Sequence, residues 1–157
     1  MFVGLGLATT CRKSVSPADA SSIRAQVQNP KARVLILARD SVIAALIGML
    51  VEMDGYDPAF PAPGESAEQA LARLRAPIVV CADCEIPEVQ SDLFYARVAR
   101  SKARVVIFGT PGSEDRMKEL AARRALHYFV LPTDRATLAR VLDTALQEKQ
   151  ASPSRQR

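Results

Sequence analysis

The sequence has few of the residues that build metal centres, redox sites and disulfide frameworks. Its 157 residues include three cysteines, one histidine and no tryptophan. A small, odd number of cysteines argues against a disulfide framework and for reduced thiols. The pair Cys81 and Cys84 would need two further ligands to hold zinc. Only Cys11 and His127 remain to supply them, so we expect no metal site.

Long apolar runs and glycine-rich loops are also missing. No run approaches the roughly 18 apolar residues that span a bilayer, so we expect no membrane partner. Gly4 and Gly6 lack the strand-to-helix context of a phosphate-binding loop, and hydrolase, kinase and dinucleotide-binding functions have no supporting motif. The opening MFVGLGLATTC has no positive charge before its apolar run, unlike a secretory signal, and we expect a cytoplasmic protein.

The formal net charge of +4 comes from the two ends of the chain. Residues 34–149 carry two more acidic than basic side chains, so we expect no specific nucleic-acid partner for this part. Residues 1–30 and 150–157 mix small and polar residues with proline and show no sustained period. We predict that both are flexible tails.

Between these ends, short apolar runs typical of buried strands alternate with segments typical of helices. The predicted strands are 33–37, 77–82, 104–109 and 127–132, and the predicted helices are 40–55, 65–75, 91–101, 113–125 and 133–149. A further, short strand is expected at DPAFPAP, whose three prolines confine it to a sheet edge. The pattern predicts an α/β fold with a five-stranded parallel sheet in the doubly wound order 2-1-3-4-5.

Four features occur in order between residues 31 and 149. They are the five-strand alternation, Gly55 with Tyr56 after the first helix, Asp83 after the third strand with Pro87 four residues on, and Tyr128 four residues before Pro132 at the fifth strand. Together they resemble the response-regulator receiver family, the CheY-like phosphoacceptor domains of two-component signalling. The resemblance implies a single flavodoxin-like (βα)5 domain over residues 31–149.

Receivers accept a phosphoryl group from a kinase histidine on the aspartate that ends strand three. The resemblance therefore makes Asp83 the phosphoacceptor-equivalent residue. In the family, two acids that end strand one hold the Mg²⁺ that neutralises the reacting anions, and a hydroxyl and a lysine ending strands four and five bind phosphoryl oxygens. Family spacing places these four assisting groups at Ala38, Arg39, Gly109 and Leu131, none of which carries the required group.

Neighbouring residues suggest two ways to complete the pocket. Asp40 and Thr110 each lie one residue beyond an assisting position, but a one-residue shift on a strand turns a side chain to the opposite face. Arg39 suggests instead a bidentate ion pair with Asp83 in place of metal and lysine. The competing interpretation is that Arg39 extends into solvent and Asp83 caps a turn.

We therefore predict a degenerate single-domain receiver, a non-enzymatic interaction module that needs no cofactor and binds a histidine kinase or another signalling protein. One alternative is an active phosphoacceptor of a phosphorelay, in which Asp40 and Glu85 hold a shifted Mg²⁺ beside Asp83. The other alternative is a thiol sensor that uses Cys81 and Cys84. A buried core thiol is the expected role of Cys81, and a structural role that of His127.

The first predicted helix contains the uncharged run VIAALIGMLV and is apolar nearly all round. A surface helix needs only an apolar stripe, so we expect the extra face to be covered, either by a second copy in a homodimer or by the segment Phe2–Leu7. Exposed apolar residues that the fold simply tolerates are the alternative. The candidate interface residues are Val42, Leu46, Met49, Leu50, Met53 and Tyr128.

Overall fold

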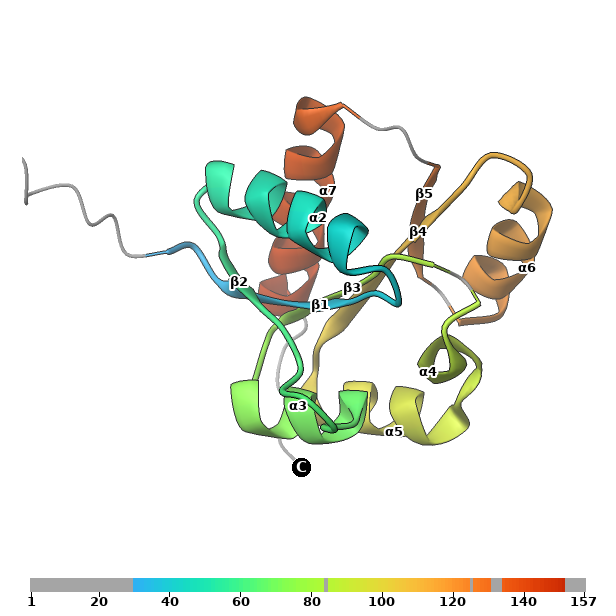
Figure 1. The fold of residues 1–157 in the computed structure, drawn as a ribbon, viewed down its shortest axis with the longest axis horizontal. Coiled ribbons are helices and arrows are strands. Elements are labelled where there is room, and N and C mark those ends of the chain that lie inside the picture. The colour runs from blue at the N-terminus through green and yellow to red at the C-terminus, as the bar shows by residue number, and fades with distance from the viewer. Residues whose placement is uncertain (1–29, 84, 125, 131–133, 152–157) are drawn as a thin grey trace, which may run out of the picture.

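The computed structural model describes residues 30–83, 85–124, 126–130 and 134–151, and these form a sheet with helices on both faces (Figure 1). The strands are β1 (Arg33–Leu37), β2 (Asp57–Ala59), β3 (Ile78–Cys81), β4 (Arg104–Gly109) and β5 (His127–Val130). The helices are α2 (Ser41–Met53), α3 (Ala67–Leu74), α4 (Pro87–Gln90), α5 (Asp92–Ser101), α6 (Glu114–Arg124) and α7 (Arg135–Ala151).

All five strands are parallel and lie in the order β2-β1-β3-β4-β5, which confirms the predicted α/β fold. The proline-containing strand β2 is at an edge and has three residues, as predicted. The carboxyl ends of β1 and β3 are neighbours, because Leu37 is in register with Cys81. The residues that follow these two strands therefore meet at one edge of the sheet.

Local sequence signals set several helix ends. Ser66 and Gln69 form a capping box at the start of α3, and Gly55, with a φ of 82°, follows the end of α2. The short helix α4 was not predicted from the sequence. It begins with Pro87 in its first turn, where a proline lacks only an N–H that has no partner in a helix.

Each face of the sheet carries its own set of helices. Side chains such as Ile36 and Val80 point toward α2 and α7, and their strand neighbours Leu37 and Cys81 point toward α3, α5 and α6. Figure 1 shows α2 above the sheet and α3 and α5 below it. Because both faces are covered, β1, β3 and β4 are buried along most of their length, and they appear as short apolar runs in the sequence.

The ends of the predicted domain need one correction. Helix α7 continues through Gln150 to Ala151, so these two residues belong to the last helix and not to a tail. The rest of the predicted tails, apart from Pro30, lies outside the described residues. None of the helices in the described ranges is long and apolar enough to span a bilayer.

Candidate functional site

The loops after β1, β3 and β4 border a cleft of about 470 Å³ at the carboxyl edge of the sheet. The lining residues are Ala38, Arg39, Asp40, Ile43, Ala82, Asp83, Glu85, Thr110, Gly112, Ser113 and Arg116. The structure thus brings together six of the residues that the sequence analysis placed in the pocket. Of the other two, Gly109 ends β4 beside the cleft, and Leu131 lies outside the described residues.

Asp83 follows β3 and is half-buried at the floor of this cleft. One of its carboxylate oxygens, Oδ1, accepts a hydrogen bond of 2.9 Å from the backbone N–H of Glu85. A carboxylate that accepts from the backbone two residues on is a common way for aspartate to stabilise a turn. Asp83 therefore caps the turn between β3 and α4, as one of the two interpretations expected.

Arg39 follows β1 and reaches across the cleft to the same turn. Its Nη2 donates a hydrogen bond of 2.8 Å to the backbone carbonyl of Glu85. No ion pair joins Arg39 to Asp83, both of which the structure describes. The hypothesis of an Arg39–Asp83 pair is therefore wrong, because a backbone carbonyl takes the guanidinium. The guanidinium does not extend free into solvent either.

Two further acids line the cleft, and both are already engaged. The Oδ1 atom of Asp40 accepts hydrogen bonds from the backbone N–H groups of Val42 (2.7 Å) and Ile43 (3.2 Å), which makes Asp40 the N-cap of α2. The carboxylate of Glu85 binds Arg116 through Oε1 and Nη1 at 3.0 Å. Asp40 and Glu85 are the acids that the alternative with a shifted metal would require.

These contacts allow a test of whether the cleft fits the Mg²⁺ that receivers hold. Mg²⁺ demands near-octahedral oxygen ligands at roughly 2.0–2.1 Å. Ala38 and Arg39 stand where the resemblance to receivers would place the two metal-holding acids, and Asp40 and Glu85 are engaged in a helix cap and an ion pair. Within the described part of the chain, no group of three or more His, Cys, Asp or Glu side chains is placed to hold a metal. The residues present do not fit Mg²⁺.

The end of β4 explains why no hydroxyl stands at position 109. A Cβ atom on Gly109 would lie 2.1 Å from Sδ of Met117 and 2.6 Å from Oγ of Ser113, closer than atoms of folded proteins approach. The neighbouring Thr110 lines the cleft, and its backbone carbonyl accepts a hydrogen bond of 2.8 Å from the Ser113 hydroxyl. The side chains of Ser113 and Met117 thus fill the space beside Gly109.

Neither Cys81 nor His127 lines the cleft. Cys81 is fully buried in the core, and burial raises the pKa of its thiol well above the ordinary value, so it is a core residue as predicted. Cys84, its proposed partner in a thiol sensor, lies outside the described residues. The ring of His127 contacts a carboxylate oxygen of Glu148 at 3.2 Å. His127 begins β5, whereas Asp83 follows the end of β3, and β4 lies between these two strands.

The predicted interface residues on α2 form an exposed apolar stripe. The exposed fractions are 65% for Val42, 51% for Leu46, 52% for Met49 and 54% for Met53. Leu50 and Tyr128 are partly buried and pack against the two hydrophobic cores. The exposed stripe on α2 therefore consists of four of the six residues named from the sequence.

Sequence reasoning missed Arg116 and Ser113. Both come from the start of α6, and they enter the cleft because that helix packs beside the end of β4. In the sequence, Arg116 and Ser113 are distinguished only by their place at the start of the predicted helix 113–125, after the strand 104–109. That position does not predict toward which neighbouring loop their side chains point.

No protein-family model matches the chain, and no curated protein matches it in sequence. Solved structures do match. A response regulator receiver domain from Clostridium thermocellum is 20% identical, with a TM-score of 0.58 over 76% of this chain and 97% of its own. The signal receiver domain of a modulated diguanylate cyclase from Desulfovibrio desulfuricans G20 is 23% identical, with a TM-score of 0.63 over 78% and 98%.

A third match extends to a longer protein. Full-length FixJ from B. japonicum is 15% identical to this chain, with a TM-score of 0.66 over 78% of this chain and 61% of its own. At such low identities the likeness establishes the fold. The described chain therefore has the receiver fold of two-component response regulators.

Proposed function

We propose that the protein is a degenerate receiver, a cytoplasmic and non-enzymatic module of two-component signalling. It acts by binding a histidine kinase or another signalling protein, without Mg²⁺-dependent phosphorylation of Asp83. The observation that carries the proposal is the set of contacts around Glu85. Its carbonyl accepts from Arg39 and its carboxylate binds Arg116, directly beside the aspartate.

These contacts leave little for a reacting phosphoryl group to use. Transfer of a phosphoryl group to a carboxylate brings two anions together, so it needs cations aimed at the charge that develops. Arg39 and Arg116 carry positive charge, but both donate to Glu85. The carboxylates of Asp40 and Asp83 accept from backbone N–H groups of their own turns. Each of these charged groups thus already has a hydrogen-bonding partner within the protein.

Paramagnetic Mn²⁺, which takes the same oxygen ligands as Mg²⁺, tests this proposal in an NMR titration. We expect no selective broadening of the amide signals next to Asp83 in the natural protein. The double variant Ala38→Asp with Arg39→Asp restores the two acids and should show that broadening. Selective broadening in the natural protein that disappears in Asp83→Asn would contradict the proposal.

We also propose that the exposed stripe on α2 binds a second copy of the chain. Its four members are Val42, Leu46, Met49 and Met53, which are spaced by four, three and four residues. The order of these spacings is the same whether it is read from the amino or from the carboxyl end of α2. In an antiparallel two-fold pair of α2 helices, Val42 therefore faces Met53 of the second copy and Leu46 faces Met49. Two-fold dimers use such self-complementary surfaces.

The rest of the surface around the stripe suits this pairing. The ring of Phe60 lies against Gly48 at one flank of α2 and is 42% exposed, which widens the apolar surface. A single helix pair is smaller than a standard interface of about 800 Å² per partner, so we expect a weak dimer that dissociates on dilution.

Sedimentation velocity over a range of protein concentrations tests the dimer. We expect the natural protein to shift from monomer to dimer as its concentration rises, and Met49→Glu to remain monomeric. Leu93→Glu is the matched control, because Leu93 is 78% exposed on α5 and should leave the equilibrium unchanged. A natural protein that stays monomeric at millimolar concentration would contradict the dimer and favour cover by residues 2–7.

A further inference from the structure

The basic side chains of the protein are not evenly paired. Of the 16 described Lys and Arg residues, eight form an ion pair with a described acid. Two more, Arg39 and Arg140, donate to a carbonyl and a hydroxyl. The remaining six have no such partner among the described residues, and they are Arg75, Arg97, Arg100, Lys102, Arg123 and Lys149.

Four of these six line one cleft of about 370 Å³, namely Arg75, Arg97, Arg100 and Lys149. They come from three different elements: the C-cap of α3, the second half of α5 and the last turn of α7. The other lining residues are Leu71, Ala72 and Ser101, so no acidic residue of the described ranges lines the cleft. A fifth unpaired cation, Lys102, is the C-cap of α5.

Helix ends account for only part of this charge. The carboxyl end of an α-helix carries roughly −0.5 elementary charge, and a nearby cation is favourable. Three such ends, those of α3, α5 and α7, meet at the cleft and together offset less than half of the charge of five cations. The site keeps a net positive charge that nothing in the described part of the protein neutralises.

We propose that this basic cleft binds an acidic peptide segment of a partner protein. The guanidinium groups of Arg75, Arg97 and Arg100 are suited to bidentate contacts with carboxylates. A volume of about 370 Å³ accommodates one or two acidic side chains rather than a nucleic-acid duplex. None of the described residues that line the cleft is an aromatic on which bases of a single strand could stack. An acidic protein segment is therefore the ligand that matches its size and chemistry.

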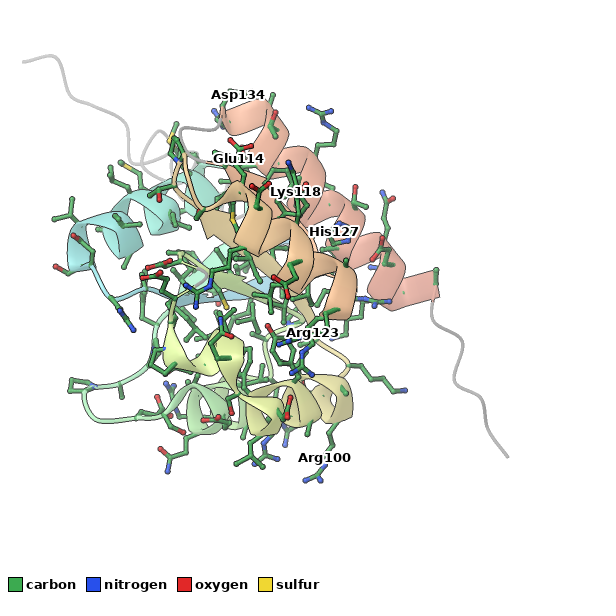
Figure 2. All side chains as sticks on the ribbon, turned by 90° about the vertical axis from the view of Figure 1, so that its right-hand side faces the viewer. Arg100, Glu114, Lys118, Arg123, His127 and Asp134 are labelled. Atoms are coloured by element: carbon green, nitrogen blue, oxygen red, sulfur yellow. The ribbon has the colours of Figure 1, made fainter. Side chains whose placement is uncertain are left out.

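The basic cleft is separate from the cleft that contains Asp83. Helices of this fold run antiparallel to the strands, so the carboxyl ends of α3, α5 and α7 lie at the amino edge of the sheet, opposite Asp83. In Figure 2, Arg100 projects from α5 away from the body of the protein, whereas Arg123 lies on α6. The inference does not depend on whether Asp83 is phosphorylated, and it adds a second binding surface to the proposed interaction module.

Fluorescence anisotropy with a labelled polyglutamate peptide tests the proposal. We expect the natural protein to bind the peptide with an affinity that falls as salt rises. The charge-reversed variant Arg97→Glu with Arg100→Glu should weaken binding at least roughly tenfold, and Arg97→Gln with Arg100→Gln by less. The matched control Arg123→Glu with Arg140→Glu changes the net charge equally and should bind like the natural protein.

Three results would overturn the proposal. The first is the absence of polyglutamate binding by the natural protein. The second is equal binding by the charge-reversed variant and its control, with both shown by circular dichroism to be folded. The third is tighter binding of an oligodeoxythymidine or of phosphatidylglycerol vesicles than of polyglutamate, because the cleft would then serve a nucleic acid or a membrane surface.

Discussion

Gly109 illustrates how one residue determines which groups stand at the cleft. It ends β4, and the side chain of Met117, which is fully buried, occupies the space where a side chain at position 109 would begin. A serine or threonine side chain at position 109 would therefore collide with its neighbours. It requires that Met117 and Ser113 move, and Met117 is held within the core that α6 shares with β4.

Gly109→Ser is expected to destabilise the protein by about 1–3 kcal/mol, as overpacking of a core usually does. Urea unfolding measures this change. In a Met117→Ala background the same substitution should cost at least about 1 kcal/mol less, because the cavity left by methionine accepts the new side chain. Equal costs in the two backgrounds would show that Met117 does not restrict position 109.

Tyr56 and Asp143 form a contact whose strength depends on pH. The hydrogen bond of 2.5 Å from the Tyr56 hydroxyl, followed by that of the Lys31 ammonium, holds the pKa of the Asp143 carboxyl below its ordinary value. Because the pKa in the folded state is below that in the unfolded state, the contact stabilises the fold above the unfolded pKa of about 3.9. This contribution is lost as the pH falls through the folded pKa.

Tyr56→Phe should therefore lower the free energy of unfolding by about 1 kcal/mol at neutral pH and by less in acid. Urea unfolding at neutral pH and near pH 3 measures both values. Tyr128→Phe is the control, because the Tyr128 hydroxyl has no hydrogen bond among the described residues. A Tyr56→Phe effect that is equal at both pH values would contradict the role of Asp143.

At the level of elements, α2 begins at an N-cap, Asp40, which is also one of the two acids that would hold the shifted Mg²⁺ in the active-phosphoacceptor alternative. Asp40 uses its carboxylate to cap the first turn. Glu85, which also lines the cleft, contacts both Arg39 and Arg116. A metal ligand and an N-cap make different demands on the side chain: Mg²⁺ prefers a charged carboxylate, whereas asparagine caps a helix as well as aspartate does.

Asp40→Ala should cost about 1 kcal/mol of stability, and Asp40→Asn close to nothing. Thermal or urea unfolding in the presence and absence of Mg²⁺ separates the two roles. The account predicts that Mg²⁺ changes neither the natural protein nor Asp40→Asn. Stabilisation of the natural protein by Mg²⁺ that is lost in Asp40→Asn would restore the active phosphoacceptor as the better explanation.

Element boundaries were predictable wherever the sequence carries a strong period or a cap. RVVIFG forms β4 over Arg104–Gly109 as predicted, and Asp40 caps α2. Helix α4 was missed because its four residues, PEVQ, are too few to show a helical period. The partner of Arg39 was not predictable, because every residue carries a backbone carbonyl. Its choice of Glu85 depends on how β1 and the turn after β3 are placed in space.

For the whole molecule, the receiver fold was predictable because four apolar strands, a proline-containing edge strand and Asp83 each have a local signature. The basic cleft was not, since Arg75, Arg97 and Lys149 are far apart in the sequence and meet only when three helices pack together. Residues 34–149 carry a net negative charge, which argues against a specific nucleic-acid partner but does not say where the basic side chains lie. In the structure, half of the described bases form ion pairs with acids, and four of the others, Arg75, Arg97, Arg100 and Lys149, line one cleft.

The central claim is that a receiver fold carries Asp83 here without the chemistry of a phosphoacceptor. Incubation with acetyl phosphate and Mg²⁺, followed by intact-protein mass spectrometry, tests it most directly, with an active receiver domain treated in parallel. The account predicts that the active receiver gains one phosphoryl group and that this protein does not. A phosphorylated species that forms in the natural protein and is absent from Asp83→Asn would contradict the account.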